Sequence, residues 1–181
     1  MNKKLSSKKQ LSHKVMIFWS MIGLLTLIFI VTVIVMFVKA RSSRSIDDLI
    51  NLHENEIFEQ KESYYIYVYS KVGITDEKAE LDKAADLEEL IITYMTYAKR
   101  NSQAKRIYGM NVDSYRNRSV LITGSQLTEV LYKTKFINLR INTDDVPILM
   151  KIEGGKVVKD YLTEKAIREE LDSQMKPIIK D

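Results

Sequence analysis

The residues best placed to carry out chemistry lie around Thr75, where a predicted loop leads into a predicted helix. Thr75 offers a hydroxyl group, and the acidic residues Asp76 and Glu77 follow it directly. A hydroxyl nucleophile needs an adjacent base, and no histidine lies near Thr75 in the sequence. Asp76 and Glu77 could form an acid pair or a weak cation site, but carboxylates in a first helical turn ordinarily interact with the helix dipole. We therefore expect no catalytic residue at this position.

Other reactive side chains are few. Tyr64, Tyr65 and Tyr67 carry hydroxyl groups on one predicted strand, where we expect their rings to pack in the core. The two histidines, His13 and His53, are expected to be solvated. Cysteine is absent, which excludes disulfides, thiol nucleophiles and thiolate-bound metal sites, and the six glycines form no phosphate-binding or dinucleotide-binding pattern. The sequence therefore predicts a protein that is not an enzyme and that has no metal site and no cofactor.

Basic residues are concentrated at the N-terminus. Residues 1–44 contain eight of the 28 Lys and Arg residues and none of the 24 acidic ones. The remainder of the chain is mildly acidic, so the net charge of +4 gives no support to nucleic-acid binding by a folded domain. A second, shorter group of basic residues consists of Lys99, Arg100, Lys105 and Arg106. We interpret it as a solvated surface, and binding of an anionic partner is the alternative.

An uncharged apolar segment of 24 residues extends from Val15 to Val38. A helix of that length measures about 36 Å, which is enough to cross a hydrocarbon core of about 30 Å with some tilt. A cleavable signal peptide has a much shorter apolar region, of about 7–15 residues. We therefore predict an uncleaved transmembrane helix at 15–38, preceded by a basic tail at 1–14.

The basic residues on either side of this segment predict its orientation. Five lysines precede the segment, and three basic residues, Lys39, Arg41 and Arg44, follow it. A transmembrane helix places its more basic flank in the cytoplasm, and a first helix usually follows this rule. We expect a single-pass protein of the cell membrane, with the N-terminus in the cytoplasm and the C-terminal domain outside it.

The chain after the membrane segment begins with a predicted helix and a predicted strand. Residues 39–62 are expected to form a juxtamembrane segment and an amphipathic helix, which Ser45 caps and which ends near Glu62. The aromatic and β-branched run Tyr64–Tyr69 predicts a strand that is buried on both faces and central in a sheet.

A βαβ unit includes this strand. Residues 70–75 are expected to form a loop, and residues 76–99 form a long helix with apolar residues at helical spacing. Residues 106–113 predict a second strand, which a right-handed crossover makes parallel to the first. Residues 125–136 are expected to be helical.

A hairpin and a helix complete the predicted domain. Two short apolar runs flank the pair Gly154-Gly155, which is typical of a hairpin turn, and Thr163 caps the last helix. The fold class is therefore α/β, with a four-stranded mixed sheet that consists of a parallel βαβ half and a C-terminal β-hairpin and is flanked by helices. The domain spans residues 63–172, and residues 173–181 form a C-terminal tail.

The order of these elements over residues 63–172 resembles the thioredoxin fold. The most specific likeness is Val146-Pro147-Ile148-Leu149, which is similar to that family's cis-proline loop and is followed by the hairpin. The stretch Tyr64–Ser70 is most similar to membrane-anchored thioredoxin-like proteins of Gram-positive bacteria, including bacteriocin-transport accessory proteins. The resemblance implies that the peptide bond between Val146 and Pro147 is cis.

The same resemblance implies that the family's redox reaction has been lost. That reaction needs a Cys-x-x-Cys motif at the start of the long helix, where the helix dipole stabilises a reactive thiolate. The two cysteine positions correspond to Gly73 and Asp76, and neither residue is cysteine. Thiol–disulfide exchange is therefore impossible, whereas the fold is retained.

The resemblance also implies a binding face. In this fold the loop at Lys71–Thr75 converges with the cis-proline loop, to which an extended peptide adds as a strand. The residues expected to bind are Lys71, Val72, Gly73, Ile74, Thr75, Asp76, Val146 and Pro147. We expect a membrane-anchored, non-enzymatic accessory module that holds a protein or peptide or joins an envelope complex, and we identify no small-molecule substrate.

A second interpretation is left open by the sequence. The chain would be a structural subunit of an export, conjugation or bacteriocin-secretion machine and would act through its membrane helix and the predicted 45–62 helix. The two interpretations differ in whether residues 1–62 are needed for the capture of a partner.

Overall fold

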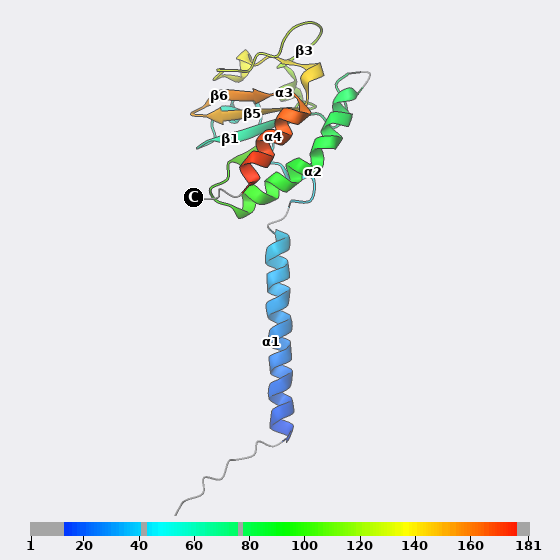
Figure 1. Ribbon diagram of the computed structural model, residues 1–181, viewed down its shortest axis with the longest axis vertical. Helices are drawn as coiled ribbons and strands as arrows, with labels where there is room; N and C mark the ends of the chain where they lie inside the picture. The colour runs from blue at the N-terminus through cyan, green and yellow to red at the C-terminus, as the bar shows by residue number, and fades with distance from the viewer. Residues whose placement is uncertain (1–12, 41–42, 76–77, 177–181) are drawn as a thin grey trace, which may run out of the picture. The chain divides into compact units, whose positions relative to one another are not determined.

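The computed structural model of the protein describes residues 13–40, 43–75 and 78–176 (Figure 1). The chain divides into two compact units, Met1–Arg41 and Ser42–Asp181.

The described residues of the first unit form one helix, α1 (His13–Ala40). Its apolar part, His13–Phe37, is long enough to cross a membrane, and none of it is buried against protein. The predicted transmembrane segment 15–38 lies within α1, whereas residues 1–12 of the predicted tail lie outside the described part of the chain.

The second unit contains a four-stranded mixed sheet. Its strands are β1 (Tyr64–Tyr69), β2 (Arg106–Asn111), β5 (Ile148–Glu153) and β6 (Lys156–Tyr161), in the order β2-β1-β5-β6. β1 is parallel to β2 and antiparallel to β5, and β5 forms an antiparallel hairpin with β6. The predicted mixed sheet, with a parallel βαβ half and a C-terminal hairpin, is confirmed.

Two helices cover one face of this sheet (Figure 1). α2 (Ala79–Arg100) connects β1 to β2, and α4 (Glu164–Met175) follows the hairpin. Thr163 caps α4 as predicted, because its hydroxyl oxygen accepts a hydrogen bond of 3.2 Å from the Ala166 amide. α4 continues to Met175, so the beginning of the predicted tail 173–181 is helical, and residues 177–181 lie outside the described part.

β1 is buried on both faces, as its unbroken apolar sequence predicts. Each residue from Tyr64 to Tyr69 is at most 2% exposed. Tyr65, Tyr67 and Tyr69 pack with α2 and α4, whereas the alternate residues pack in a second core on the other side of the sheet. β1 therefore gives the domain a rigid centre from which the loop after Tyr69 extends.

Short elements surround the sheet. The 3₁₀ helix η1 (Ile46–Asp48) packs on the helix side, against α2. The other short elements are the 3₁₀ helices η2 (Glu54–Phe58), η3 (Phe136–Asn138) and η4 (Thr143–Asp145), together with α3 (Tyr115–Arg118), β3 (Leu121–Ile122) and β4 (Ile141–Asn142). β3 and β4 form a separate two-stranded parallel sheet.

The predicted amphipathic helix from Ser45 to Glu62 is wrong. Ser45 does act as a cap, since its hydroxyl oxygen accepts the Asp47 amide at 3.2 Å, but it caps only the short η1. The chain then becomes extended and pairs with the edge of β2: Leu52 N donates to the Gly109 carbonyl at 2.8 Å, and Gly109 N donates to the Ile50 carbonyl at 2.9 Å. Backbone pairing and burial outweigh the weak preference of this segment for a helix.

The segment 45–62 is consequently part of the folded domain and not a stalk. Four of its apolar side chains are buried: Leu49, Leu52, Ile57 and Phe58. Leu49 packs on the helix side of the sheet and Leu52 on the opposite side, which is the alternation expected of an extended chain.

The predicted helix at 125–136 is also wrong. This segment is an irregular loop with a turn at Leu131 and Tyr132, where Tyr132 N donates to the Val157 carbonyl at 2.8 Å and Val157 N donates to the Lys133 carbonyl at 3.1 Å. Tyr132 has a left-handed backbone with a φ of 61°, which a helix does not allow. Pairing with the chain at Val157 and burial of Val130 and Phe136 fix the segment in this form.

Two turn predictions are confirmed. Gly154 and Gly155 form the hairpin turn between β5 and β6, with φ values of 57° and 70°. The peptide bond between Val146 and Pro147 is cis. The predicted start of the long helix at Asp76 lies outside the described residues, and the described part of α2 begins at Ala79.

Candidate functional site

The two predicted binding segments lie at the same end of the sheet. The loop that begins at Ser70 follows the carboxyl end of β1. β5 is antiparallel to β1 with Ile148 opposite Val68, so Pro147 precedes β5 at the end where β1 stops. Ile74 of the loop packs against the core cluster that contains Val146. The sheet therefore brings the two segments to one edge of the domain.

Asp113 holds the first half of the loop. Ser70 Oγ donates to Asp113 Oδ1 at 2.5 Å, and Lys71 N donates to Asp113 Oδ2 at 2.7 Å. Gly73 N in turn donates to Ser70 Oγ at 3.0 Å. Asp113 is in position because Val112 N, one residue earlier, donates to the Tyr69 carbonyl and continues the pairing of β2 with β1.

Glu80 holds the second half of the loop. Its carboxylate accepts hydrogen bonds from Thr75 N at 2.9 Å, from Thr75 Oγ1 at 2.8 Å and from Ile74 N. Glu80 is only 4% exposed, and burial alone would raise its pKa. The hydrogen bonds from Thr75 and Ile74 outweigh burial and lower the pKa of Glu80.

The predicted site residues differ in what they present to solvent. Lys71 and Val72 are exposed, and Val72 retains 67% of its accessible surface. Val146 and Pro147 are buried, so they can offer a partner backbone atoms but little side-chain surface. Lys71 forms an ion pair with Asp47 of η1. Asp76 lies outside the described residues.

Lys83 is a residue that sequence reasoning missed. Its Nζ donates to the carbonyls of Asp145 and Leu162, both at 2.6 Å, and thereby ties α2 to the residue before Val146 and to the approach to α4. Burial lowers the pKa of Lys83 to about 8, although the carboxylates of Asp145 and Glu164 act in the opposite direction. The residues around Lys83 in α2 are those expected around a solvated lysine, so the sequence does not indicate its contacts with the Asp145 and Leu162 carbonyls.

A cavity of about 290 Å³ lies beside the loop, between β1 and α2. Tyr67, Tyr69, Ser70 and Lys71 line it from the strand and the loop, and Glu88 lines it from the helix. Sequence reasoning assigned the two tyrosines to the core and did not predict an opening next to them.

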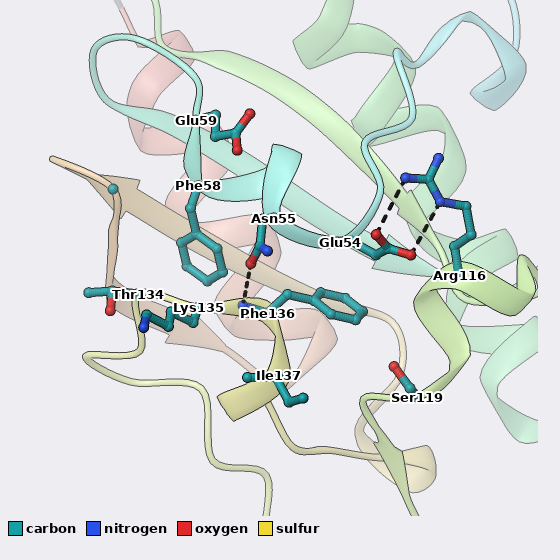
Figure 2. Close-up of a pocket in the computed structure, with 11 residues that line it drawn as sticks. Glu54, Asn55, Phe58, Glu59, Arg116, Ser119, Thr134, Lys135, Phe136 and Ile137 are labelled. Carbon is teal, nitrogen blue, oxygen red and sulfur yellow. Dashed lines mark hydrogen bonds and ion pairs between the residues drawn. The ribbon is translucent and has the colours of Figure 1, made fainter.

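A hollow of about 790 Å³ lies elsewhere, between η2 and η3 (Figure 2). Glu54 and Arg116 form an ion pair of 3.3 Å at its side, and Asn55 accepts a hydrogen bond of 3.2 Å from Phe136 N. Three of the polar side chains there, those of Glu54, Asn55 and Arg116, thus already have partners within the domain. None of the described residues of the predicted binding site line this hollow.

Within residues 13–40, 43–75 and 78–176, no three His, Cys, Asp or Glu side chains are grouped so that they could hold a metal ion. No family model matches the chain, and no curated protein matches it either.

Proposed function

We propose that this chain is a redox-inactive, membrane-anchored thioredoxin-like protein that binds a polypeptide outside the cytoplasm. The strand order β2-β1-β5-β6, with one parallel pair and a C-terminal hairpin followed by α4, agrees with that resemblance. The chain contains no cysteine, which excludes the thiol–disulfide exchange of that family, and we propose binding in its place.

The observation that carries the proposal is an exposed aliphatic side chain on a loop that the domain holds rigidly. Val72 is 67% exposed, while Asp113 fixes the backbone on one side of it and Glu80 fixes the backbone on the other. A preorganised loop loses little conformational entropy when it binds. The backbone at Val146 and Pro147, at the same edge of the sheet, supplies polar groups for an extended peptide.

Membrane attachment completes the proposal. α1 would anchor the protein, and the larger number of basic residues before α1 than after it favours an extracytoplasmic domain. The domain would thus be held at the outer surface of the membrane, where it could bind a polypeptide that is exported to, or assembled at, that surface.

The alternative, a structural subunit that acts through helices next to the membrane, loses part of its basis. The segment 45–62 that was to make those contacts is packed into the domain, with Leu52 and Ile57 at most 7% exposed. This alternative retains contacts made by α1 and by the side chains of this segment that stay exposed, such as Ile50.

Site-specific crosslinking tests the proposal. Because the chain has no native cysteine, the introduced cysteine is its only thiol. Val72→Cys and Ile137→Cys would be introduced singly into the full-length protein and activated with a short crosslinker in native membranes. Ile137 is a matched control, because it is also aliphatic and is 74% exposed but lies in η3. We expect polypeptide adducts, identified by mass spectrometry, at Val72→Cys alone. Identical adducts at both positions, or none at Val72→Cys, would overturn the proposal.

A further inference from the structure

We infer that the cavity between β1 and α2 is a subsite for one basic side chain, Lys or Arg, of the bound polypeptide. The inference rests on the proposed function and names the kind of residue that this face selects. The cavity has a volume of about 290 Å³, and two of the residues that line it, Ser70 and Lys71, directly precede Val72.

One residue that lines the cavity has a buried, unpaired hydroxyl. Tyr67 lines it and is 1% exposed, yet its hydroxyl has no hydrogen-bond partner among the described residues. The neighbouring tyrosines of β1 are all paired: Tyr64 donates to the Ile57 carbonyl at 2.7 Å, Tyr65 donates to Glu170, and Tyr69 donates to Asn51 at 3.2 Å. Buried polar groups without a partner are rare, so this hydroxyl indicates a place for a ligand atom.

The charge at the cavity favours a cationic ligand. Glu88 lines it from α2 and forms no ion pair with any residue that the structure describes. Burial, together with Tyr69 and Glu88, raises the pKa of Tyr67, so its hydroxyl stays neutral and can accept a hydrogen bond from an ammonium or guanidinium group. Lys71 also lines the cavity, but Asp47 neutralises it.

The walls suit the methylene groups of a long basic side chain. Leu81, Ala84 and Ala85 of α2 give an apolar side, and the Tyr67 and Tyr69 rings are stacked with their centroids 5.5 Å apart. A second hollow, of about 350 Å³, shares Ala85 and Glu88 with the first and adds the carboxylate of Glu89. A carboxylate ligand would be repelled here, and a purely apolar one would leave the Tyr67 hydroxyl unpaired.

The cavity is within reach of a polypeptide on the loop. Lys71 belongs to both the loop and the cavity wall, and Val72 is the next residue. Since an extended chain advances about 3.3–3.6 Å per residue, a ligand residue one or two positions from the contact with Val72 lies at the cavity.

The test uses the full-length protein in detergent micelles and follows the ring resonances of Tyr67 and Tyr69 by NMR. The Tyr67 resonances are assigned with Tyr67→Phe, and binding to that variant is measured at the Tyr69 ring, which also lines the cavity. The probes are N-acetyl-lysine amide, N-acetyl-arginine amide and the neutral control N-acetyl-norleucine amide. We expect a basic amide to shift these resonances saturably, and norleucine amide to leave them unchanged. Tyr67→Phe and Glu88→Gln should each weaken the binding at least about tenfold, the effect of losing one charge-assisted hydrogen bond.

Matched controls are Tyr115→Phe and Glu169→Gln, since Tyr115 is 87% exposed and Glu169 lies on the outer side of α4 paired with Lys165. These two variants should bind like the wild type. Equal binding of norleucine amide, or no binding of either basic amide to the wild type, would overturn the subsite. Tyr67→Phe removes only an unpaired hydroxyl, so a native-like amide spectrum is expected for it.

The outcomes separate this inference from the proposed function. Crosslinks at Val72→Cys without any effect of basic amides would retain the polypeptide site and reject the basic subsite. Binding of a basic amide at Tyr67 without crosslinks at Val72→Cys would reject the polypeptide site and leave a pocket for a small organic cation.

Discussion

The carboxylate of Glu80 binds the backbone and the side chain of Thr75 together, accepting the Thr75 amide at 2.9 Å and the Thr75 hydroxyl at 2.8 Å. Glu80 also accepts the amide of Ile74. One buried carboxylate therefore links the first turn of α2 to the loop that we propose for binding, and the order of this loop depends on it.

Replacing Glu80 should consequently destabilise the domain. Glu80→Ala leaves the half-buried donors of Thr75 and Ile74 without their partner, which we expect to lower the free energy of unfolding by about 1–3 kcal/mol. Glu89→Ala, at an exposed position of the same helix, should change it by less than about 0.5 kcal/mol. Urea denaturation of the full-length protein in detergent measures both, and equal effects would contradict the anchoring role.

The same contact predicts a loss of stability in acid. Hydrogen bonds lower the pKa of Glu80 below its ordinary value of 4.5, so the stabilisation is fully present above about pH 4.5 and is lost as the pH falls through the lower folded-state value. Glu80→Gln has no charge to lose at this position. The difference in unfolding free energy between the wild type and Glu80→Gln should therefore shrink on acidification. A constant difference would contradict the prediction.

Lys83 predicts a further gain of stability with pH, in weak alkali. Burial lowers its folded-state pKa to about 8 from an ordinary value of 10.5, so the unfolded chain binds more protons than the folded one between these values. The contribution of Lys83 to stability should accordingly rise as the pH increases from about 8 to about 10. Thermal unfolding across this range should show the rise in the wild type and a flatter profile in Lys83→Met. Parallel profiles would show that Lys83 is solvated.

Gly109 tests the pairing of the juxtamembrane segment with β2. A Cβ at this position would collide with the side-chain oxygen of Asn51 and lie 3.2 Å from the Tyr69 ring. We expect Gly109→Ala to cost about 1–3 kcal/mol of stability, as overpacking does. In an Asn51→Ala background the same change should cost less, because the collision is gone, and a chemical-denaturation double-mutant cycle measures the difference. Additive effects would mean that Asn51 and Gly109 do not meet.

Sequence reasoning succeeded where one segment contains the whole pattern. The unbroken run Tyr64–Tyr69 has no polar position, which in a strand implies burial on both faces, and β1 is indeed central. The pair Gly154-Gly155 likewise supplies the positive φ values of its turn without outside help.

It failed where structure depends on residues far apart. The spacing of apolar residues after Ser45 fits a helix, but the segment pairs with Gly109, nearly sixty positions later. The local sequence contains no feature that indicates this pairing. The loop anchors show the same limit: Glu80 looks like one of several acids at a helix start, and Asp113 meets Ser70 only once β1 and β2 are paired. The cavity at Tyr67 arises from packing of α2 on β1, which composition does not encode.

The orientation of the chain in the membrane is open to a direct test, because any cysteine introduced is the only one. Five lysines before the apolar segment against three basic residues after it predict a cytoplasmic N-terminus. Ser6→Cys places a thiol in the basic tail, and Ile137→Cys places one on the exposed surface of the domain.

In intact cells freed of their wall, a membrane-impermeant maleimide should label Ile137→Cys at once and Ser6→Cys only after the membrane is permeabilised. The protein labelled at Ile137→Cys should have the mass of the full chain, since an anchor of 24 uncharged residues is too long for a cleavable signal peptide. Label on Ser6→Cys before permeabilisation would reverse the topology, and with it the extracytoplasmic partner. A labelled product that begins near Arg41 would show that the segment is cleaved and that the domain is released from the membrane.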